Sequence, residues 1–202
     1  MLKTNIHHPA DSTLLFDSVR KTIDNCQFIS KKYKIPGWKQ AEYLVGKLKI
    51  KIRLSIKLKH STSKNKIKKE ERAKEILESQ KSFLELAEKY LKLAETTPKV
   101  LSRRVFAPQE TELLSHFMTY AYYILEQAKR RIINKEKKPH EEIIFSVLQP
   151  HTEWISKGKS GVPFELGKRV CICKDQHGFI IHHQVLDHQT DDQITVDFLR
   201  EA

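Results

Sequence analysis

Two long segments carry apolar residues at helical spacing, and they constrain the fold more than any other feature of the chain. The first stripe consists of Ala73, Ile76, Leu77, Leu84, Ala87, Leu91 and Ala94, and the second of Leu113, Phe117, Ala121, Ile124, Ala128 and Ile132. Steps of three, four and seven residues place such side chains on one face of an α-helix. Neither segment contains a glycine or an internal proline. We therefore predict two long antiparallel helices packed face to face, with their aromatic residues in the core.

Two further helices are predicted before these. A helical pattern runs from Asp11 to about Ile35 and is stopped by the pair Pro36-Gly37. In residues 48–58 the apolar side chains alternate strictly with residues that are mostly Lys or Arg. An apolar residue at every second position is typical of a strand, but helical patterns lie on both sides of this stretch. We predict a helix here, which would bury both of its apolar rows only if it were contacted on two sides.

The character of the chain changes after Lys138-Pro139. Residues 143–147 are a short apolar run that predicts a buried strand. Residues 169–174 and 179–186 flank a short loop ending in Gly178, which predicts a β-hairpin. Thr190 and Gln193 have the spacing of a capping box, so a helix should begin there. A strand, a hairpin and the first turns of a helix do not close a domain, and we expect the sequence to end inside a fold.

Length and composition exclude some classes of protein. The chain has 202 residues, of which 39% are hydrophobic, enough to bury a core. It lacks the run of roughly 20 apolar residues that a membrane span needs, and no signal-peptide-like run follows Met1. We expect a cytoplasmic protein.

Two cysteines, Cys171 and Cys173, would share one face of a strand. A zinc site could be completed by one or more of His177, His182, His183 and His188. The spacing instead favours two buried thiols.

The positive charge is concentrated in one region. The net charge is +12, and residues 39–72 hold twelve Lys or Arg against three Glu, whereas residues 140–202 hold six basic and ten acidic residues. A basic segment of this kind favours a polyanion such as DNA, RNA or an anionic membrane surface. A solvated helical face would give the same pattern.

Two segments are distinctive as motifs. The first is Thr-Asn-Ile-His-His-Pro-Ala-Asp-Ser at residues 4–12, and the second is Gln-Pro-His-Thr-Glu-Trp-Ile-Ser-Lys-Gly-Lys at residues 149–159. From the residues alone, His7, His8 and Asp11 could bind a metal, although adjacent histidines diverge in most backbones. Lys157 and Lys159 around Gly158 could face a phosphate.

Together and in this order, these segments resemble the transposases of the ISNCY group of bacterial insertion sequences. The likeness spans nearly the whole chain, and it is strongest at residues 4–20 and 143–199. The resemblance implies a ribonuclease-H-like fold with a long helical insertion, and DNA transposition by an Asp-Asp-Glu enzyme. Such an enzyme holds two Mg²⁺ ions about 3.5–4 Å apart with carboxylates.

The resemblance also indicates what this chain lacks. In the family, the first Asp precedes the segment at residues 4–12, and the second Asp and the Glu follow the helix that begins near Thr190. We therefore expect no catalytic residue and no cofactor in this chain, although the intact family uses Mg²⁺. Gln149 stands where the family usually has Glu, and Ala10 where Thr is usual, which favours a decaying copy. Asp175, Asp191 and Asp192 are ordinary turn and cap residues rather than substitutes.

The expected fold is α+β. Residues 1–10 would follow the missing first catalytic strand, residues 11–138 would be the helical insertion, and residues 139–202 would form an incomplete ribonuclease-H-like portion. The residues that would lie near the family's active site are His7, His8, Asp11, His151 and Glu153. The residues expected to contact DNA are Lys47, Lys49, Lys51, Arg53, Lys57, Lys59, Lys64, Lys66, Lys68, Lys69, Lys157 and Lys159.

Two functions are expected from these features. The first is a transposase component, which is inactive in DNA cleavage when alone. The alternative is a non-enzymatic DNA-binding protein, for instance a truncated product that regulates transposition. The expected partners are DNA and either the full-length transposase or a second copy of the chain, with no membrane. Because residues 47–74 contain no aromatic residue, stacking on single strands is not expected.

Overall fold

The computed structural model describes residues 10–60, 66–136, 144–147, 149, 151–156, 164–187 and 189–201. Its contacts divide the described chain into two compact units, residues 10–147 and residues 149–201. The first unit is helical, and the second contains two small antiparallel sheets and one helix. The described chain is therefore α+β and mostly helical.

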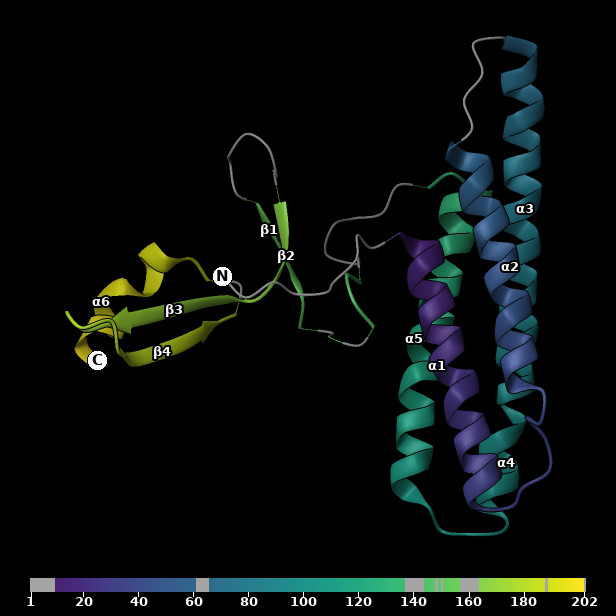
Figure 1. The fold of residues 1–202 in the computed structure, drawn as a ribbon, viewed down its shortest axis with the longest axis horizontal. Coiled ribbons are helices and arrows are strands. Elements are labelled where there is room, and N and C mark those ends of the chain that lie inside the picture. The colour runs from purple at the N-terminus through teal and green to yellow at the C-terminus, as the bar shows by residue number, and fades with distance from the viewer. Residues whose placement is uncertain are drawn as a thin grey trace. The chain divides into compact units, whose positions relative to one another are not determined.

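The described part of the helical unit contains four long helices and one short one, which Figure 1 labels. They are α1 (Asp11–Lys32), α2 (Ala41–His60), α3 (Lys66–Ala94), α4 (Thr96–Ser102) and α5 (Pro108–Ile133). Helix α1 contacts α2, α3 and α5, and α3 also contacts α2 and α5. Two side-chain pairs, Lys129 with Glu88 and Tyr122 with Glu95, show that α3 and α5 run in opposite directions. The predicted pair of long antiparallel helices is confirmed.

The core of this unit lies between the four long helices. Its fully or almost fully buried residues include Leu15, Val19, Ile23, Leu48, Phe83, Leu84, Leu91, Ile124 and Ala128. The α3 stripe is buried only from Ser79 onward, since Ala73 is exposed and Ile76 and Leu77 are half-buried. In α5, Leu114 is buried whereas the predicted Leu113 is 47% exposed. The first turns of α3 therefore lie outside the core.

Helix α2 confirms the helical interpretation of the alternating segment, but it buries only one of the two apolar rows. Leu48 and Ile52 lie in the core, whereas Ile50 is 67% exposed and Leu54 is 47% exposed. Successive residues of a helix are about 100° apart, so alternate residues fall on opposite sides. Because α2 packs mainly against α1 and α3, it keeps an uncovered outer face.

The smaller unit is built from two hairpins and a helix. Strand β1 (Glu153–Ser156) pairs antiparallel with β2 (Phe164–Gly167), and β3 (Arg169–Lys174) pairs antiparallel with β4 (Ile180–Leu186). The predicted hairpin around Gly178 is thus confirmed. Helix α6 (Asp191–Glu201) follows, and the backbone N–H of Thr190 donates to Gln193 Oε1 at 3.0 Å, as expected of a capping box.

One face of the β3–β4 hairpin carries the core of this unit. Leu186, Ile194 and Phe198 are buried together, and the two strand thiols, Cys171 and Cys173, pack against them. On the same hairpin, the ring of His182 lies 4.7 Å from the ring of Phe198. The cysteines are therefore part of a small apolar cluster.

The strand predicted at residues 143–147 is wrong for the part that the structure describes. Residues 144–147 have no strand pairing. Val147 is buried in the core of the helical unit, and Ile144 packs against the same core. A short apolar run can pack against helices as well as within a sheet, and its sequence does not distinguish the two.

Candidate nucleic-acid interface

Helix α2 is strongly basic. Residues 47–60 include six Lys or Arg and no Asp or Glu. Three of them, Lys49, Arg53 and Lys57, are exposed and follow one another at steps of four residues. Four residues advance a helix by about 6 Å and turn it by only about 40° beyond a full circle. These three cations therefore form a single row along the helix, which we call the cation row.

The cation row is electrostatically uncompensated within the described chain. No described carboxylate lies within ion-pair distance of Lys49, Arg53 or Lys57, whereas ion pairs do occur on α1, α3 and α5. The other α2 cations have neighbours on the helical unit. Lys51 donates to Ser82 Oγ at 2.9 Å, and the ammonium of Lys47 lies 4.6 Å from the centre of the Tyr43 ring. Among the residues that the structure describes, the row thus presents three charges without a carboxylate neighbour.

The C-terminal end of α2 adds a second group of cations. Burial lowers the pKa of Lys59 below its ordinary value, and the positive charge of Arg131 lowers it further. Arg131 belongs to the last turn of α5, and its Nη1 atom is 3.2 Å from Asp11 Oδ2. Sequence reasoning missed Arg131. The only available signal was its place at the end of the second apolar stripe.

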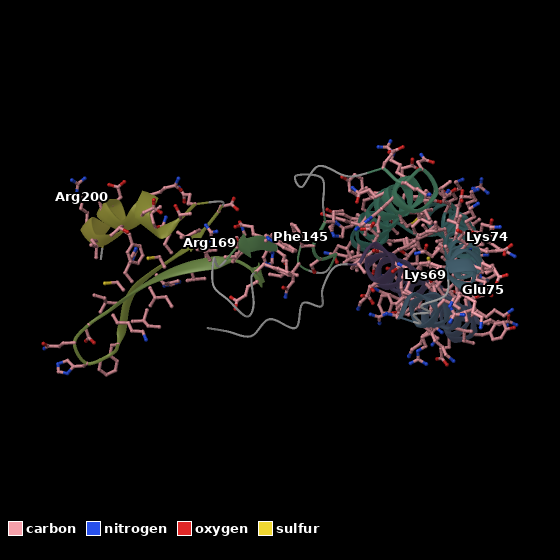
Figure 2. The ribbon with its side chains drawn as sticks, turned by 90° about the horizontal axis from the view of Figure 1, so that it is seen from above. Lys69, Lys74, Glu75, Phe145, Arg169 and Arg200 are labelled. Carbon is pink, nitrogen blue, oxygen red and sulfur yellow. The ribbon has the colours of Figure 1, made fainter. Side chains whose placement is uncertain are left out.

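The first turns of α3 carry a mixture of charges. Residues 66–78 hold five basic and four acidic residues. Lys68 and Lys69 are exposed, and Arg72 is 3.3 Å from Glu75. Figure 2 shows Lys74 and Glu75 on the outside of the helical unit. This segment therefore offers less net charge than α2. Of the remaining expected DNA contacts, Lys64, Lys157, Lys159 and the side chain of Lys66 lie outside what the structure describes.

Two of the described motif residues, Asp11 and Glu153, have ion-pair partners in their own units. Asp11, the first residue of α1, faces Arg131. Glu153, buried at the start of β1, pairs with Lys168, which also pairs with Asp187. These two carboxylates hold the pKa of Lys168 above its ordinary value, with Asp187 the larger cause.

His151 is the remaining described residue of those expected near the family's active site. His151 is exposed in the turn before β1, and His7 and His8 lie outside the described residues. Within the described ranges, no three His, Cys, Asp or Glu side chains are grouped closely enough to hold a metal ion. Because Asp11 and Glu153 each face a cation, these two carboxylates do not fit a Mg²⁺ site.

The fold and the cation row define an α+β protein with a strongly basic row of side chains on one of its described helices. Comparison with protein-family models, with curated proteins and with solved structures gave no match. None of the described helices is long and apolar enough to span a membrane.

Proposed function

We propose that this protein binds the phosphate backbone of duplex DNA through α2, as a component related to insertion-sequence transposases. The observation that carries the proposal is the cation row, in which Lys49, Arg53 and Lys57 are exposed and have no described carboxylate partner. Lys and Arg that contact phosphates release condensed counterions, and this supplies most of the free energy of sequence-independent binding.

The chemistry of the row favours backbone contact over base recognition. Its neighbours on the outer face of α2 include the exposed apolar residues Ile50 and Leu54, which offer no hydrogen-bond donor to a base edge. Residues 47–74 contain no aromatic side chain on which unpaired bases could stack. The resemblance to transposases supports DNA over RNA as the polyanion, in a cytoplasmic protein.

Two roles fit such a binding surface. The chain could be one component of an Asp-Asp-Glu transposase in DNA recombination, or a non-enzymatic protein that occupies the DNA on which that enzyme acts. The ion pairs of Asp11 and Glu153 favour the second role, because a carboxylate that is paired with Arg or Lys is a poor ligand for Mg²⁺. We propose that the chain alone binds DNA and does not cut it.

The test compares two double variants that remove the same charge. Arg53→Gln/Lys57→Gln changes the cation row, and Lys81→Gln/Lys89→Gln changes two exposed lysines of α3. Binding to a fluorescent duplex of about 25 base pairs would be followed by anisotropy at several salt concentrations. Each phosphate that a cation neutralises contributes ~0.9 to the slope of log K against log salt, so the slope should become shallower by about 1.8 in the first variant.

The control variant should keep the slope of the unmodified chain. If both variants lower the affinity and the slope equally, the interaction depends on net charge alone and α2 has no special part in it. Helical circular dichroism of each variant confirms that the fold is retained.

A further inference from the structure

A second basic feature lies at the other end of α2, where the chain turns from α1 into α2. It is a hollow of about 1140 Å³ lined by the last turn of α1, the connecting residues, the first turn of α2 and Arg104. Pockets that hold small-molecule ligands usually enclose ~300–1,000 Å³, so this hollow has room for a nucleotide-sized molecule. Tyr43 at its edge and Lys49, the nearest member of the cation row, are six residues apart, which is about 9 Å along the helix and about 120° around it.

The lining is strongly positive. It includes four cations, Lys31, Lys34, Lys39 and Arg104, and a single carboxylate, Glu42. All four cations are exposed, and none is ion-paired with any residue that the structure describes. Charges of one sign around a concave, low-dielectric wall focus their field, and a concave site therefore attracts an anion more strongly than the same charges on a convex helix.

The neighbouring Lys32 differs from the lining cations because it has a carboxylate partner. Its ammonium pairs with Glu110, which also accepts a hydrogen bond from the Tyr33 hydroxyl at 2.8 Å. The lining cations Lys31 and Lys34, on either side of it in sequence, have no such acceptor among the described residues. An incoming anion would supply the missing acceptor.

The floor of the hollow is held in place by buried contacts. Ser30 Oγ lies 2.6 Å from the carbonyl oxygen of Ile35 and 2.9 Å from that of Gly37, and it can donate to either. The Ile35 N–H donates to Ser30 O at 3.0 Å, and the Ile35 side chain is buried. The indole N–H of Trp38 donates to Thr97 Oγ1 at 2.8 Å, which fixes the indole against the helical unit. A wall that is already ordered loses little conformational entropy when a ligand binds.

We propose that this hollow is a binding site for an oligophosphate, either a free phosphate chain or the phosphate chain of a nucleotide. Four cations around one cavity can hold several phosphate oxygens at once through charge-assisted hydrogen bonds. The site is separate from the cation row and goes beyond the proposed DNA binding.

Isothermal titration calorimetry of the full chain tests the proposal with inorganic tripolyphosphate and, separately, with ATP in the absence of Mg²⁺. The variant Lys34→Gln/Lys39→Gln removes two lining charges, and Lys81→Gln/Lys89→Gln removes two exposed charges elsewhere. We expect one saturable site in the unmodified chain and in the control. The lining variant should bind at least about tenfold more weakly, because it can no longer form two of the charge-assisted hydrogen bonds.

Tripolyphosphate and ATP separate the two sources of the ligand. Equal affinities mean that the phosphate chain alone is recognised, and tighter binding of ATP means that the hollow also holds the nucleoside. Absence of a saturable site for both compounds, or an equally weakened affinity in the control variant, overturns the proposal. Duplex binding by the lining variant should stay unchanged, so failure here is distinguishable from failure of the proposed DNA binding.

Discussion

Leu48 and Ile50 provide the sharpest test of how α2 is oriented in the helical unit. Both belong to the same alternating apolar segment, and a strand would place them on one face. In the helix Leu48 is fully buried, whereas Ile50 is 67% exposed. Replacing each in turn with Ala therefore gives a matched pair in which the same segment loses either a core side chain or a surface side chain.

The expected magnitudes follow from this burial. Leu48→Ala removes three carbon atoms from the core, worth about 2.4 kcal/mol at ~0.8 kcal/mol per methylene. The cavity left behind raises the total loss of unfolding free energy to about 3–4 kcal/mol. Ile50 keeps about two thirds of its surface in water, so Ile50→Ala loses only about 0.8 kcal/mol of burial. The better helix propensity of Ala offsets a few tenths of that, which leaves about 0.5 kcal/mol.

Urea denaturation of the full chain, followed by circular dichroism at 222 nm, measures both values. The dependence of the unfolding free energy on urea should be the same for both variants, so that the midpoints report stability directly. Equal losses for the two variants would refute the helical register of α2. A larger loss for Ile50→Ala would mean that its face is covered in solution.

Three further outcomes follow from the structure. The ammonium of Lys32 and the Tyr33 hydroxyl hold the Glu110 pKa at about 2, below its ordinary 4.5. Since this carboxylate has a depressed pKa, its contribution to stability is present above pH 4.5 and is lost as the pH falls toward 2. The chain should therefore melt higher than Glu110→Gln at pH 7, and the difference should vanish near pH 2. Burial raises the pKa of the Cys26 thiol to about 11, so Ellman's reagent at pH 8 should titrate the half-buried Cys171 and Cys173 promptly and Cys26 only after denaturation; rapid reaction of all three would contradict the packing of α1. Finally, incubation with supercoiled plasmid and Mg²⁺ should give no nicked product, because Asp11 and Glu153 are ion-paired; a nick that depends on Mg²⁺ and on Glu153 would show that these ion pairs do not prevent metal binding.

Much of the helical unit could be predicted from the periodicity of the sequence, because long helices repeat the same pattern many times. The stripes in α3 and α5 fixed both helices, although Leu114 rather than Leu113 turned out to be buried. The extent of the core was not predictable, since it depends on where α3 extends beyond its neighbours. For the same reason, the pattern of α2 could not show that only one of its apolar rows is covered.

The smaller unit was harder to predict, because its strands are short. The β1–β2 pair was missed, since each strand has only four residues, which are too few to establish an alternating pattern. The β3–β4 hairpin was found because longer strands flank a turn that ends in Gly178, where φ is 87°. The opposite error occurred at Val147, since the apolar run that contains it was predicted to be a strand but packs against helices.

Part of the candidate site could likewise be predicted from the sequence, and part could not. The concentration of Lys and Arg near residues 47–59 was visible in the sequence, whereas the exposed row of Lys49, Arg53 and Lys57 was recognised only in the structure. Contacts between distant segments were not visible, such as the approach of Arg131 to Asp11 and Lys59. The hollow beside Trp38 likewise depends on Arg104, which no local pattern connects to the α1–α2 turn.

The central claim is that the chain binds duplex DNA through phosphate contacts, and the most direct measurement is the salt dependence of binding by the unmodified protein. Anisotropy titrations of a fluorescent duplex between about 50 and 200 mM salt give log K against log salt. Three phosphate contacts by the cation row predict a slope of about −2.7 or steeper, with similar values for duplexes of unrelated sequence. No binding at the lowest salt concentration, or an affinity that salt leaves unchanged, would contradict the claim.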